Sequence, residues 1–374
     1  MEKQVKILSL VSYQFLPPNM GGQKCIAYFN RYLSKKISLS CITTKNNSKH
    51  ADEGYCIENI LSNSPIRYIN PLYFFKLRQI IRQKKITHLI IEHPYYGWLG
   101  ILLKWICKVK LIVHAHNIEA MRFKSMNRWW WGILWNYEKI TYRMADSTFF
   151  ITDEDQAYAI SKYKLVPQKC STITYGVELS QPPSFADKQI AREQICITHD
   201  INHNDKILLF NGTLGYKPNL DALDIILEKI NPQLQVVEDF KYKIIICGSK
   251  LPDGYQGLID HKEKNIVYAG FVEDINLYFK GADIFINPVI DGGGIKTKVV
   301  ESLGFNLDVI STASGAIGIP VEITGGKLVV VPDNDCDEFG RQIILHTAAK
   351  TIPAVYFEHF YWGNIAAKAV AIMK

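Results

Sequence analysis

Short apolar runs recur along the chain, and longer amphipathic stretches separate them. In the first half, the runs that predict strands are VKILSLVS, ISLSCITT, THLIIEH, VKLIVHAH and DSTFFIT. After a polar, proline-containing stretch at 180–205, the pattern restarts with KILLFNG, KYKIIICGS, NIVYAG, ADIFINP, LDVISTA and KLVVVP. Apolar runs without alternation, separated by helices, are typical of parallel strands buried on both faces. The pattern therefore predicts two doubly wound α/β domains, joined by a linker within 180–205.

Composition narrows the class of protein. The chain has 374 residues, of which 48% are hydrophobic and 21% charged, and this excludes a disordered, collagen-like or coiled-coil chain. The eight cysteines are scattered without a C-x-x-C pair, so we expect reduced thiols and no metal site. No signal peptide is visible, and lysines interrupt the longest apolar stretch at 95–114. We therefore expect a cytoplasmic protein without a membrane span.

Candidate chemistry lies at the strand-to-helix turns, because ligands of such sheets bind beyond the carboxyl ends of the strands, here in the cleft between two domains. In one turn, Gly292, Gly293 and Gly294 precede a predicted helix that begins near Lys298. Glycines let the backbone approach a phosphate, and free N–H groups at a helix start favour an anion. Lys298 adds a point charge for a diphosphate, and Glu301 can accept hydrogen bonds from two ribose hydroxyls. The alternative is a glycine turn followed by a solvated Lys–Glu pair.

Several segments together resemble the retaining glycosyltransferase family 4, whose fold is GT-B. The segment from Gly292 reads GGGIKTKVVESLG and is similar to the donor-binding signature of that family. Further similar segments follow the family's order: PPNMGG, HAHNIE, ADSTFFITDEDQ, TYGVEL, FNGTLGYKPN, GFVEDINLYFKGADIFINP and FEHFYWGNIAAKAVAIMK. The resemblance implies an acceptor-binding Rossmann-like domain at 1–185 and a donor-binding one at 186–355. It also implies a C-terminal helix at 356–374 that crosses back to the first domain.

The resemblance implies a role for each matching residue. The catalytic residues that it implies are His116, Lys217, Lys298 and Glu301. The donor-binding residues that it implies are Gly21, Gly22, Gly212, Thr213, Gly292, Gly293, Gly294, Ile295, Lys296 and Thr297. The acceptor-binding residues that it implies are Glu92, His93, Asn117 and Glu119. For His116, Glu92 and His93 the alternative is a structural role beside a core strand.

Two features depart from the usual pattern of the family. Many members carry Glu-x7-Glu, in which Glu301 would be the second carboxylate, and Gly293 stands in place of the first. A branch of the family has glycine there, followed by an arginine whose place Lys296 takes. Thr213 stands where the family often has arginine, which leaves Lys217 for a phosphate.

The implied reaction has clear electrostatic demands. Breaking a sugar–diphosphate bond builds positive charge on the sugar and negative charge on the leaving diphosphate, which the protein must stabilise. The resemblance implies front-face attack with retention, in which a donor phosphate oxygen takes the acceptor proton and no metal cofactor takes part. We expect a UDP- or GDP-sugar donor and an acceptor glycan, lipid-linked, in bacterial envelope polysaccharide or glycolipid assembly. Two alternatives stay open, a non-catalytic nucleotide-sugar-binding subunit and a nucleotide-sugar epimerase of the same fold.

Charge is distributed unevenly along the chain. Residues 1–180 carry a net charge of +13, and residues 181–374 carry −6. The basic half contains MRFKSMNRWWWGILWNYEKITYR, in which four tryptophans lie among arginines and lysines. Such a segment suits an anionic membrane surface, which would place the protein peripherally on the inner face of the cell membrane. The alternative is a helix that packs Trp129, Ile133 and Tyr137 against the core. Nucleic acid is not expected, because no recognition motif accompanies the segment.

Overall fold

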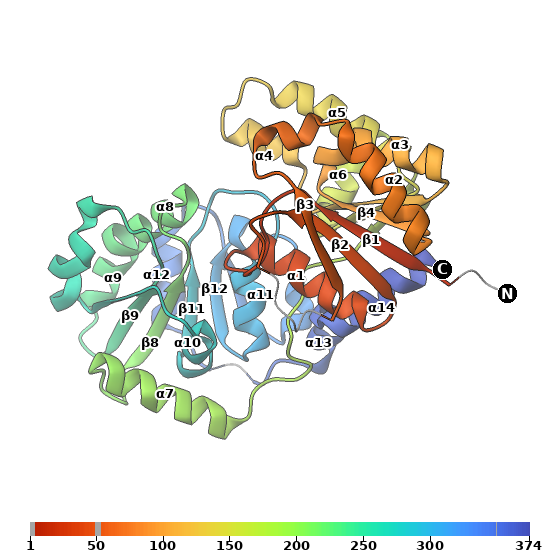
Figure 1. Ribbon diagram of the computed structural model, residues 1–374. Coiled ribbons are helices and arrows are strands. Elements are labelled where there is room, and N and C mark those ends of the chain that lie inside the picture. Colours follow the sequence, from red (N-terminus) through yellow and green to blue (C-terminus); the bar gives the residue numbers. More distant parts are fainter. Residues whose placement is uncertain (1–3, 49–53, 349) are drawn as a thin grey trace. The chain divides into compact units, whose positions relative to one another are not determined.

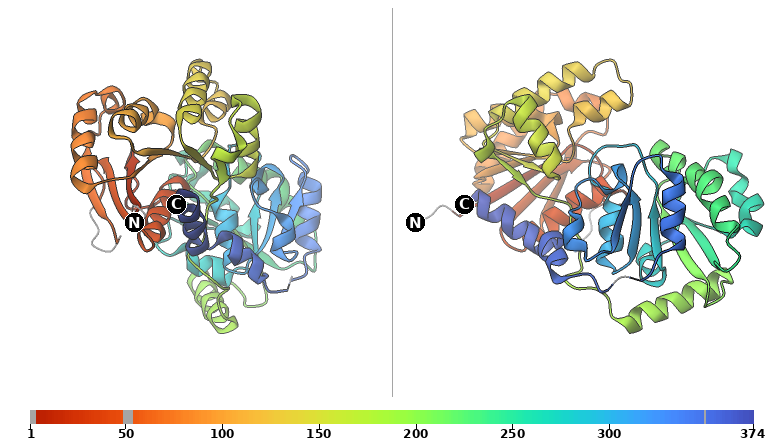
Figure 2. Two further views of the ribbon diagram at one scale, coloured as in Figure 1. Left: turned by 90° about the vertical axis from the view of Figure 1, so that its right-hand side faces the viewer. Right: turned by 180° about the vertical axis from the view of Figure 1, so that it is seen from behind.

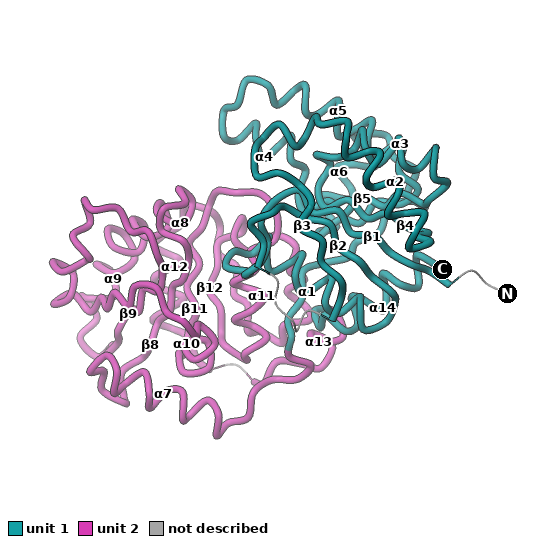
Figure 3. The backbone as a smooth tube through the Cα atoms, in the orientation of Figure 1, with its two compact units in different colours: residues 1–178, 360–374 teal, residues 179–359 magenta. Residues whose placement is uncertain are grey.

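The computed structural model describes residues 4–48, 54–348 and 350–374. The chain divides into two compact units: unit 1 is Met1–Glu178 with Phe360–Lys374, and unit 2 is Leu179–His359 (Figure 3). The sequence placed these boundaries after residues 185 and 355. Among the helices of the described residues, none has the length and apolar character needed to cross a membrane.

Unit 1 contains a parallel sheet of seven strands among its described residues (Figure 1). In spatial order the strands are β3 (Cys56–Leu61), β2 (Ser38–Thr44), β1 (Lys6–Val11), β4 (His88–Glu92), β5 (Lys110–Ala115), β6 (Ser147–Phe150) and β7 (Cys170–Thr172). The strand order reverses between β1 and β4, which makes the carboxyl ends of these two strands the topological switch point. Strands β1, β4 and β5 are almost wholly buried, so their sequences are continuous apolar runs.

The five strands predicted for this half are confirmed, and the sheet adds two that the sequence did not predict. Strand β3 reads CIENIL and is mostly half-buried, and β7 has only three residues. They form the two edges of the sheet. An edge strand is covered on fewer sides than a central one, so it does not require a continuous apolar run.

Helices cover both faces of this sheet (Figures 1 and 2). The helices of unit 1 are α1 (Gly21–Ser34), α2 (Leu72–Lys84), α3 (Gly97–Cys107), α4 (Glu119–Ser125), α5 (Trp131–Met144), α6 (Asp153–Tyr163) and α14 (Trp362–Met373). Helix α14 packs against α1, and its first residue, Trp362, is fully buried in unit 1. The predicted C-terminal helix therefore returns to the first unit, after a break that separates it from α13 (Ala354–Phe360).

The tryptophan-rich segment is divided between solvent and core. Trp129 and Ile133 are 83% and 66% exposed, so the alternative in which both pack against the core is wrong. Trp135 does pack inward, where its indole N–H donates to the Tyr158 hydroxyl at 3.0 Å. Tyr137 also points inward and accepts a hydrogen bond from the backbone of α3. Trp129, just before α5, and Ile133, in its first turn, thus present apolar side chains to solvent.

The described part of unit 2 contains a second parallel sheet, of six strands (Figure 1). Their spatial order is β10 (Ile266–Gly270), β9 (Tyr242–Cys247), β8 (Lys206–Asn211), β11 (Ile284–Asn287), β12 (Asp308–Thr312) and β13 (Leu328–Val331). All six strands match predicted runs. The switch point of this sheet lies between β8 and β11.

The helices of unit 2 complete its two layers. They are α7 (Phe185–His199), α8 (Lys217–Ile225), which continues through a π-helical turn at Ile226–Ile230 into α9 (Asn231–Gln235), α10 (Ile275–Gly281), α11 (Thr297–Gly304) and α12 (Cys336–Ile344). The stretch at 180–205, within which the sequence predicts the linker, is mostly helix α7. Ser184 and Asp187 form a capping box at its start, and Ala191, Ile195 and Cys196 form its buried face. Because α7 packs against α10, it belongs to unit 2 and the connection ends before it.

Candidate functional site

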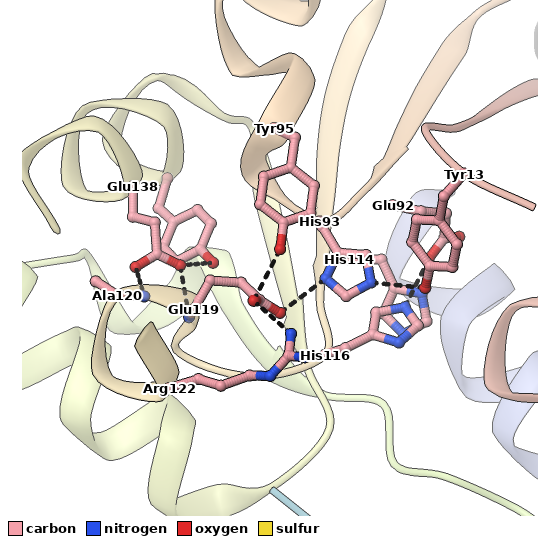
Figure 4. Close-up of polar contacts among 11 residues, drawn as sticks. Tyr13, Glu92, His93, Tyr95, His114, His116, Glu119, Ala120, Arg122 and Glu138 are labelled. Atoms are coloured by element: carbon pink, nitrogen blue, oxygen red, sulfur yellow. Dashed lines mark hydrogen bonds and ion pairs between the residues drawn. The ribbon is translucent and has the colours of Figure 1, made fainter. Parts of the chain in front are cut away.

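Four titratable side chains gather at the carboxyl ends of β4 and β5, beside the switch point of unit 1 (Figure 4). Glu92 ends β4 and His93 follows it, while His114 lies near the end of β5 and His116 follows that strand. The carboxyl ends of neighbouring parallel strands share one edge of the sheet, so residues far apart in sequence meet here. The rings of His93 and His116 stack, with centroids 4.3 Å apart.

Glu92 joins two of these histidines. Its Oε2 lies 2.9 Å from Nδ1 of His114 and 2.8 Å from Nε2 of His116. Although burial alone would raise it, His114 and His116 hold the pKa of the Glu92 carboxyl well below its usual range. Burial alone would lower the pKa of His116, but Cys25 and Glu92 raise it to about 9. The raised pKa favours the imidazolium form of His116, which can stabilise a developing negative charge.

His93 belongs to a second, adjoining network. Its Nδ1 lies 3.1 Å from Oε1 of Glu119, and its Nε2 lies 3.0 Å from the Tyr13 hydroxyl. The Tyr95 hydroxyl and Arg122 donate to Oε2 of Glu119, at 2.8 and 3.0 Å. Although burial alone would raise it, His93, Arg122 and Tyr95 lower the pKa of Glu119 to about 2. Burial lowers the pKa of His93, so this network holds a neutral imidazole beside a carboxylate.

Glu138, which the sequence did not single out, fixes the backbone of this network. Its two carboxyl oxygens accept the backbone N–H groups of Glu119 and Ala120, both at 2.9 Å, and the hydroxyls of Tyr142 and Tyr163. It thereby caps the start of α4 from a neighbouring helix. Burial raises the pKa of Glu138 to about 7. The position of Glu119 thus depends on a side chain of α5.

The remaining predicted residues of unit 1 lie on α1 and in the turn after β5. Gly21 and Gly22 are the first two residues of α1. Asn117 is partly buried in the turn between β5 and α4. The sequence analysis did not single out Tyr13 and Tyr95. Each lies within three residues after the end of a strand, and this position is the signal that could have identified them.

In unit 2 the second residue of α11, Lys298, reaches across to the end of β8. Its Nζ donates to the backbone oxygen of Asn211 and to Oδ1 of Asn219, both at 3.1 Å, and lies 4.5 Å from the centroid of the Phe210 ring. Burial, together with the charge of Lys296, lowers the pKa of Lys298 to about 7. Because the partners of Lys298 are neutral oxygens, an anion bound beside it would favour its protonated, positively charged form.

Gly212 makes room for this contact. A Cβ on Gly212 would lie 2.7 Å from Nδ2 of Asn219, closer than side chains tolerate. The same amide of Asn219 donates to the backbone oxygen of Thr213 at 3.1 Å. Asn219 is therefore a positioning residue for Lys298, and local sequence gave no signal for it because its partner is remote in the chain.

The glycine loop leads directly into α11. Gly292 and Gly294 have φ of +92° and +72°, in the left-handed region that favours glycine. Lys296 is the N-cap residue of α11, and its Nζ donates to the backbone oxygens of both glycines. Burial lowers the pKa of Lys296 to about 8. Gly293 is exposed, with open space where a Cβ would stand. Two lysines thus lie at the start of one helix, where free backbone N–H groups and positive charge favour an anion.

The other predicted donor residues lie around this loop, and Lys217 differs from them in its exposure. Ile295 and Thr297 flank Lys296, and Glu301 is partly buried on α11, one turn after Lys298. Lys217 begins α8, but its side chain is 80% exposed and its ammonium pairs with Asp221. The structure therefore brings Lys296 and Lys298 to one helix start. Lys217 begins α8 beside the same loop, because a Cβ on Gly292 would lie 3.7 Å from Cγ of Pro218, the residue that follows Lys217.

Two family profiles match the chain. Residues 20–181 match the profile described as Glycosyltransferase Family 4, and residues 205–346 match that of Glycosyl transferases group 1. A curated relative, an uncharacterized 44.6 kDa protein in the cps region of Klebsiella pneumoniae, is 25% identical over 285 residues. This match covers 72% of the present chain and 67% of that protein.

Solved structures share the fold over nearly the whole length. A glycosyltransferase from Rickettsia africae ESF-5 superposes with a TM-score of 0.73 at 17% identity, covering 100% of this chain and 99% of that chain. Anabaena Alr3699/HepE in complex with UDP gives a TM-score of 0.71 at 15% identity, with 99% of each chain covered. Identity this low shows the fold alone. The chain therefore carries a domain that matches Glycosyltransferase Family 4, followed by one that matches Glycosyl transferases group 1. Its fold is GT-B.

Proposed function

We propose that the protein transfers a sugar from a nucleotide-diphosphate sugar to a hydroxyl of an acceptor glycan, with retention of configuration. The observation that carries this proposal is the anion site of unit 2. Lys298 is held by neutral oxygens of Asn211 and Asn219, and Lys296 shapes a glycine loop at the same helix start. This arrangement offers positive charge and backbone N–H groups to a diphosphate.

We assign each part of the nucleotide-sugar donor to one of the protein groups of this site. The diphosphate would contact Lys298 and the first N–H groups of α11, and Glu301 would accept hydrogen bonds from the ribose. The complex of Alr3699/HepE with UDP supports a UDP-sugar as the first donor to test, and a GDP-sugar is the second. The two lysines and the helix start supply the charge that the leaving group needs, so the proposed transfer uses no cofactor.

The proposed step breaks the bond between the anomeric carbon and the diphosphate oxygen. The acceptor oxygen bonds to that carbon from the same face, and its proton passes to the departing phosphate oxygen. This route requires no protein nucleophile, in accord with the buried carboxylates of Glu92 and Glu119, which are engaged by hydrogen bonds. Glu92 would orient His116, whose imidazolium stabilises negative charge on the donor. His93 and Asn117 would contact the acceptor, and Glu119 would orient His93.

We further propose that the acceptor is lipid-linked and that unit 1 docks on an anionic membrane during envelope polysaccharide or glycolipid assembly. Trp129, Ile133 and Ile140 are exposed on one segment, and exposed Lys124 and Arg128 lie beside Trp129 in sequence. Aromatic, apolar and basic side chains together suit a headgroup interface. The cps region named for the Klebsiella relative supports a role in polysaccharide assembly.

A thermal-shift panel of UDP-, GDP- and ADP-sugars tests the donor proposal. A ligand present at about 100 times its Kd stabilises the folded state by about 2.7 kcal/mol. We expect a UDP- or GDP-sugar to raise the Tm of the wild type, and Lys298→Met to abolish that rise. The matched control is Lys188→Met, because Lys188 is also a partly buried lysine of unit 2 but donates to Asn306. A panel without any response would refute the proposal, and donor turnover without acceptor would favour the epimerase alternative.

A further inference from the structure

Three side chains with metal-binding atoms converge in unit 1. Cys25 lies on α1, His114 on β5 and His116 just after β5, and one ligand atom from each lies within 4.8 Å of the other two. All three residues are buried, with 3%, 1% and 7% of their surface exposed. No local sequence pattern predicts this group, because Cys25 comes from a helix remote in the chain from the two histidines.

The hydrogen bonds of Glu92 determine which imidazole nitrogens remain for a ligand. A carboxylate only accepts, so Nδ1 of His114 and Nε2 of His116 both carry hydrogens directed at Glu92. The free nitrogen is then Nε2 of His114, which is buried and without a hydrogen-bond partner among the described residues. For His116 the nitrogen that is not directed at Glu92 is Nδ1, and Cys25 is a further hydrogen-bond partner of this imidazole. Carboxylates that orient histidines in this way are the usual outer shell of metal sites.

The types of ligand atom determine which class of metal ion the group suits. A thiolate with two imidazoles suits zinc and similar transition metals, whereas Mg²⁺ and Ca²⁺ prefer oxygen ligands. Zn–N bonds of about 2.0–2.1 Å and Zn–S bonds of about 2.3 Å place tetrahedral ligand atoms about 3.3–3.6 Å apart. The present separations are all within 4.8 Å, so the ligand atoms must approach one another when an ion binds. The charge of the ion would also compensate the buried carboxylate of Glu92 and the thiolate of Cys25.

We propose that Cys25, His114 and His116 bind a divalent transition metal of the zinc class, and that the bound ion inhibits the protein by occupying His116. On binding, the Cys25 thiol and any imidazolium in the group release protons to solvent. Nδ1 of His116 then binds the ion while Nε2 stays on Glu92, so the imidazole cannot exchange its contact with Cys25 for one with the donor. The inhibitory part rests on the proposed function, and the binding part does not.

Cobalt(II) is the probe for binding, because its spectrum reports both geometry and thiolate coordination. We expect one equivalent of Co²⁺ added to the full-length protein in thiol-free buffer to give tetrahedral visible bands and a thiolate-to-metal charge-transfer band. Zn²⁺ should abolish both by displacement. Cys25→Ser should remove the charge-transfer band and weaken binding at least about tenfold. The matched control is Cys170→Ser, which replaces another buried thiol of unit 1 and should keep the full spectrum. A spectrum that is absent, or that persists in Cys25→Ser, overturns the proposed site.

Circular dichroism and thermal melting of the metal-free variants show whether each is folded, and His114→Gln gives a second test of the same site. For inhibition, we expect one equivalent of Zn²⁺ to suppress the donor-induced rise in Tm in the wild type and to spare it in Cys25→Ser. A donor response that Zn²⁺ leaves unchanged overturns the inhibitory part. If no nucleotide sugar gives a response even without metal, the proposed function fails, and the cobalt spectrum still decides the metal site.

Discussion

Replacement of Glu138 by glutamine should destabilise unit 1 in a pH-dependent way. Each oxygen of this buried carboxyl accepts one backbone N–H, from Glu119 or from Ala120, and one tyrosine hydroxyl. Glutamine keeps the shape but turns an NH₂ group toward one of those N–H groups, and only the hydroxyls can rotate to accommodate it. A buried donor left without a partner costs about 1–3 kcal/mol. For a unit of this size each 1 kcal/mol lowers the Tm by about 2–4 °C.

The pH dependence follows from the raised pKa of Glu138. Its pKa is about 7 in the folded protein against 4.5 as the ordinary value, so the folded state binds the extra proton between these pH values. The wild type therefore loses stability through this group as pH rises toward 7, whereas Glu138→Gln does not. Between pH 5.5 and 8 the stability advantage of the wild type over Glu138→Gln should shrink by about 2 kcal/mol.

Urea unfolding followed by tryptophan fluorescence measures this difference. All seven tryptophans lie in unit 1, so the signal reports the unit that contains Glu138. Glu154→Gln is the matched control, because Glu154 is exposed and its replacement should change stability little at either pH. An advantage of the wild type that stays constant or grows from pH 5.5 to 8 would refute the reasoning.

Three further predictions concern the donor site and the exposed surface. Because Lys298 has a pKa of about 7 and a diphosphate binds its charged form, the donor Kd measured by calorimetry should rise with pH above 7, by up to about tenfold per unit, and should be flatter in Lys298→Met; a flat wild-type profile would contradict this. Gly212→Ala should weaken donor binding, because the new Cβ displaces Asn219. Gly293→Ala places its Cβ in open space and should leave the Tm of the donor-free protein unchanged. Equal changes in Tm for the two variants would argue against the packing reason. Trp129→Ala should reduce sedimentation with anionic phosphatidylserine vesicles, with Val236→Ala in unit 2 as the exposed apolar control, and binding that salt does not weaken would speak against an electrostatic contribution.

The sequence by itself determined the central strands of the two sheets and predicted the glycine turn and lysines of the proposed donor site. Central strands such as β4 and β5 are buried on both faces, so their apolar runs are unbroken and mark them. The turn from Gly292 to Lys298 is also local, because the backbone freedom of glycine and the free N–H groups of a helix start act within a few residues. Edge strands β3 and β7 escaped prediction because their environment requires little apolar sequence.

Only the tertiary structure decided which side chains meet. Glu92 reaches His114 and His116 because β4 and β5 lie side by side in parallel register, and Cys25 reaches the same place from α1. Asn219 positions Lys298 for the same kind of reason. Local sequence patterns record how each segment is buried, but a contact between distant segments depends on strand order, register and packing. Those features arise only when the whole chain has folded.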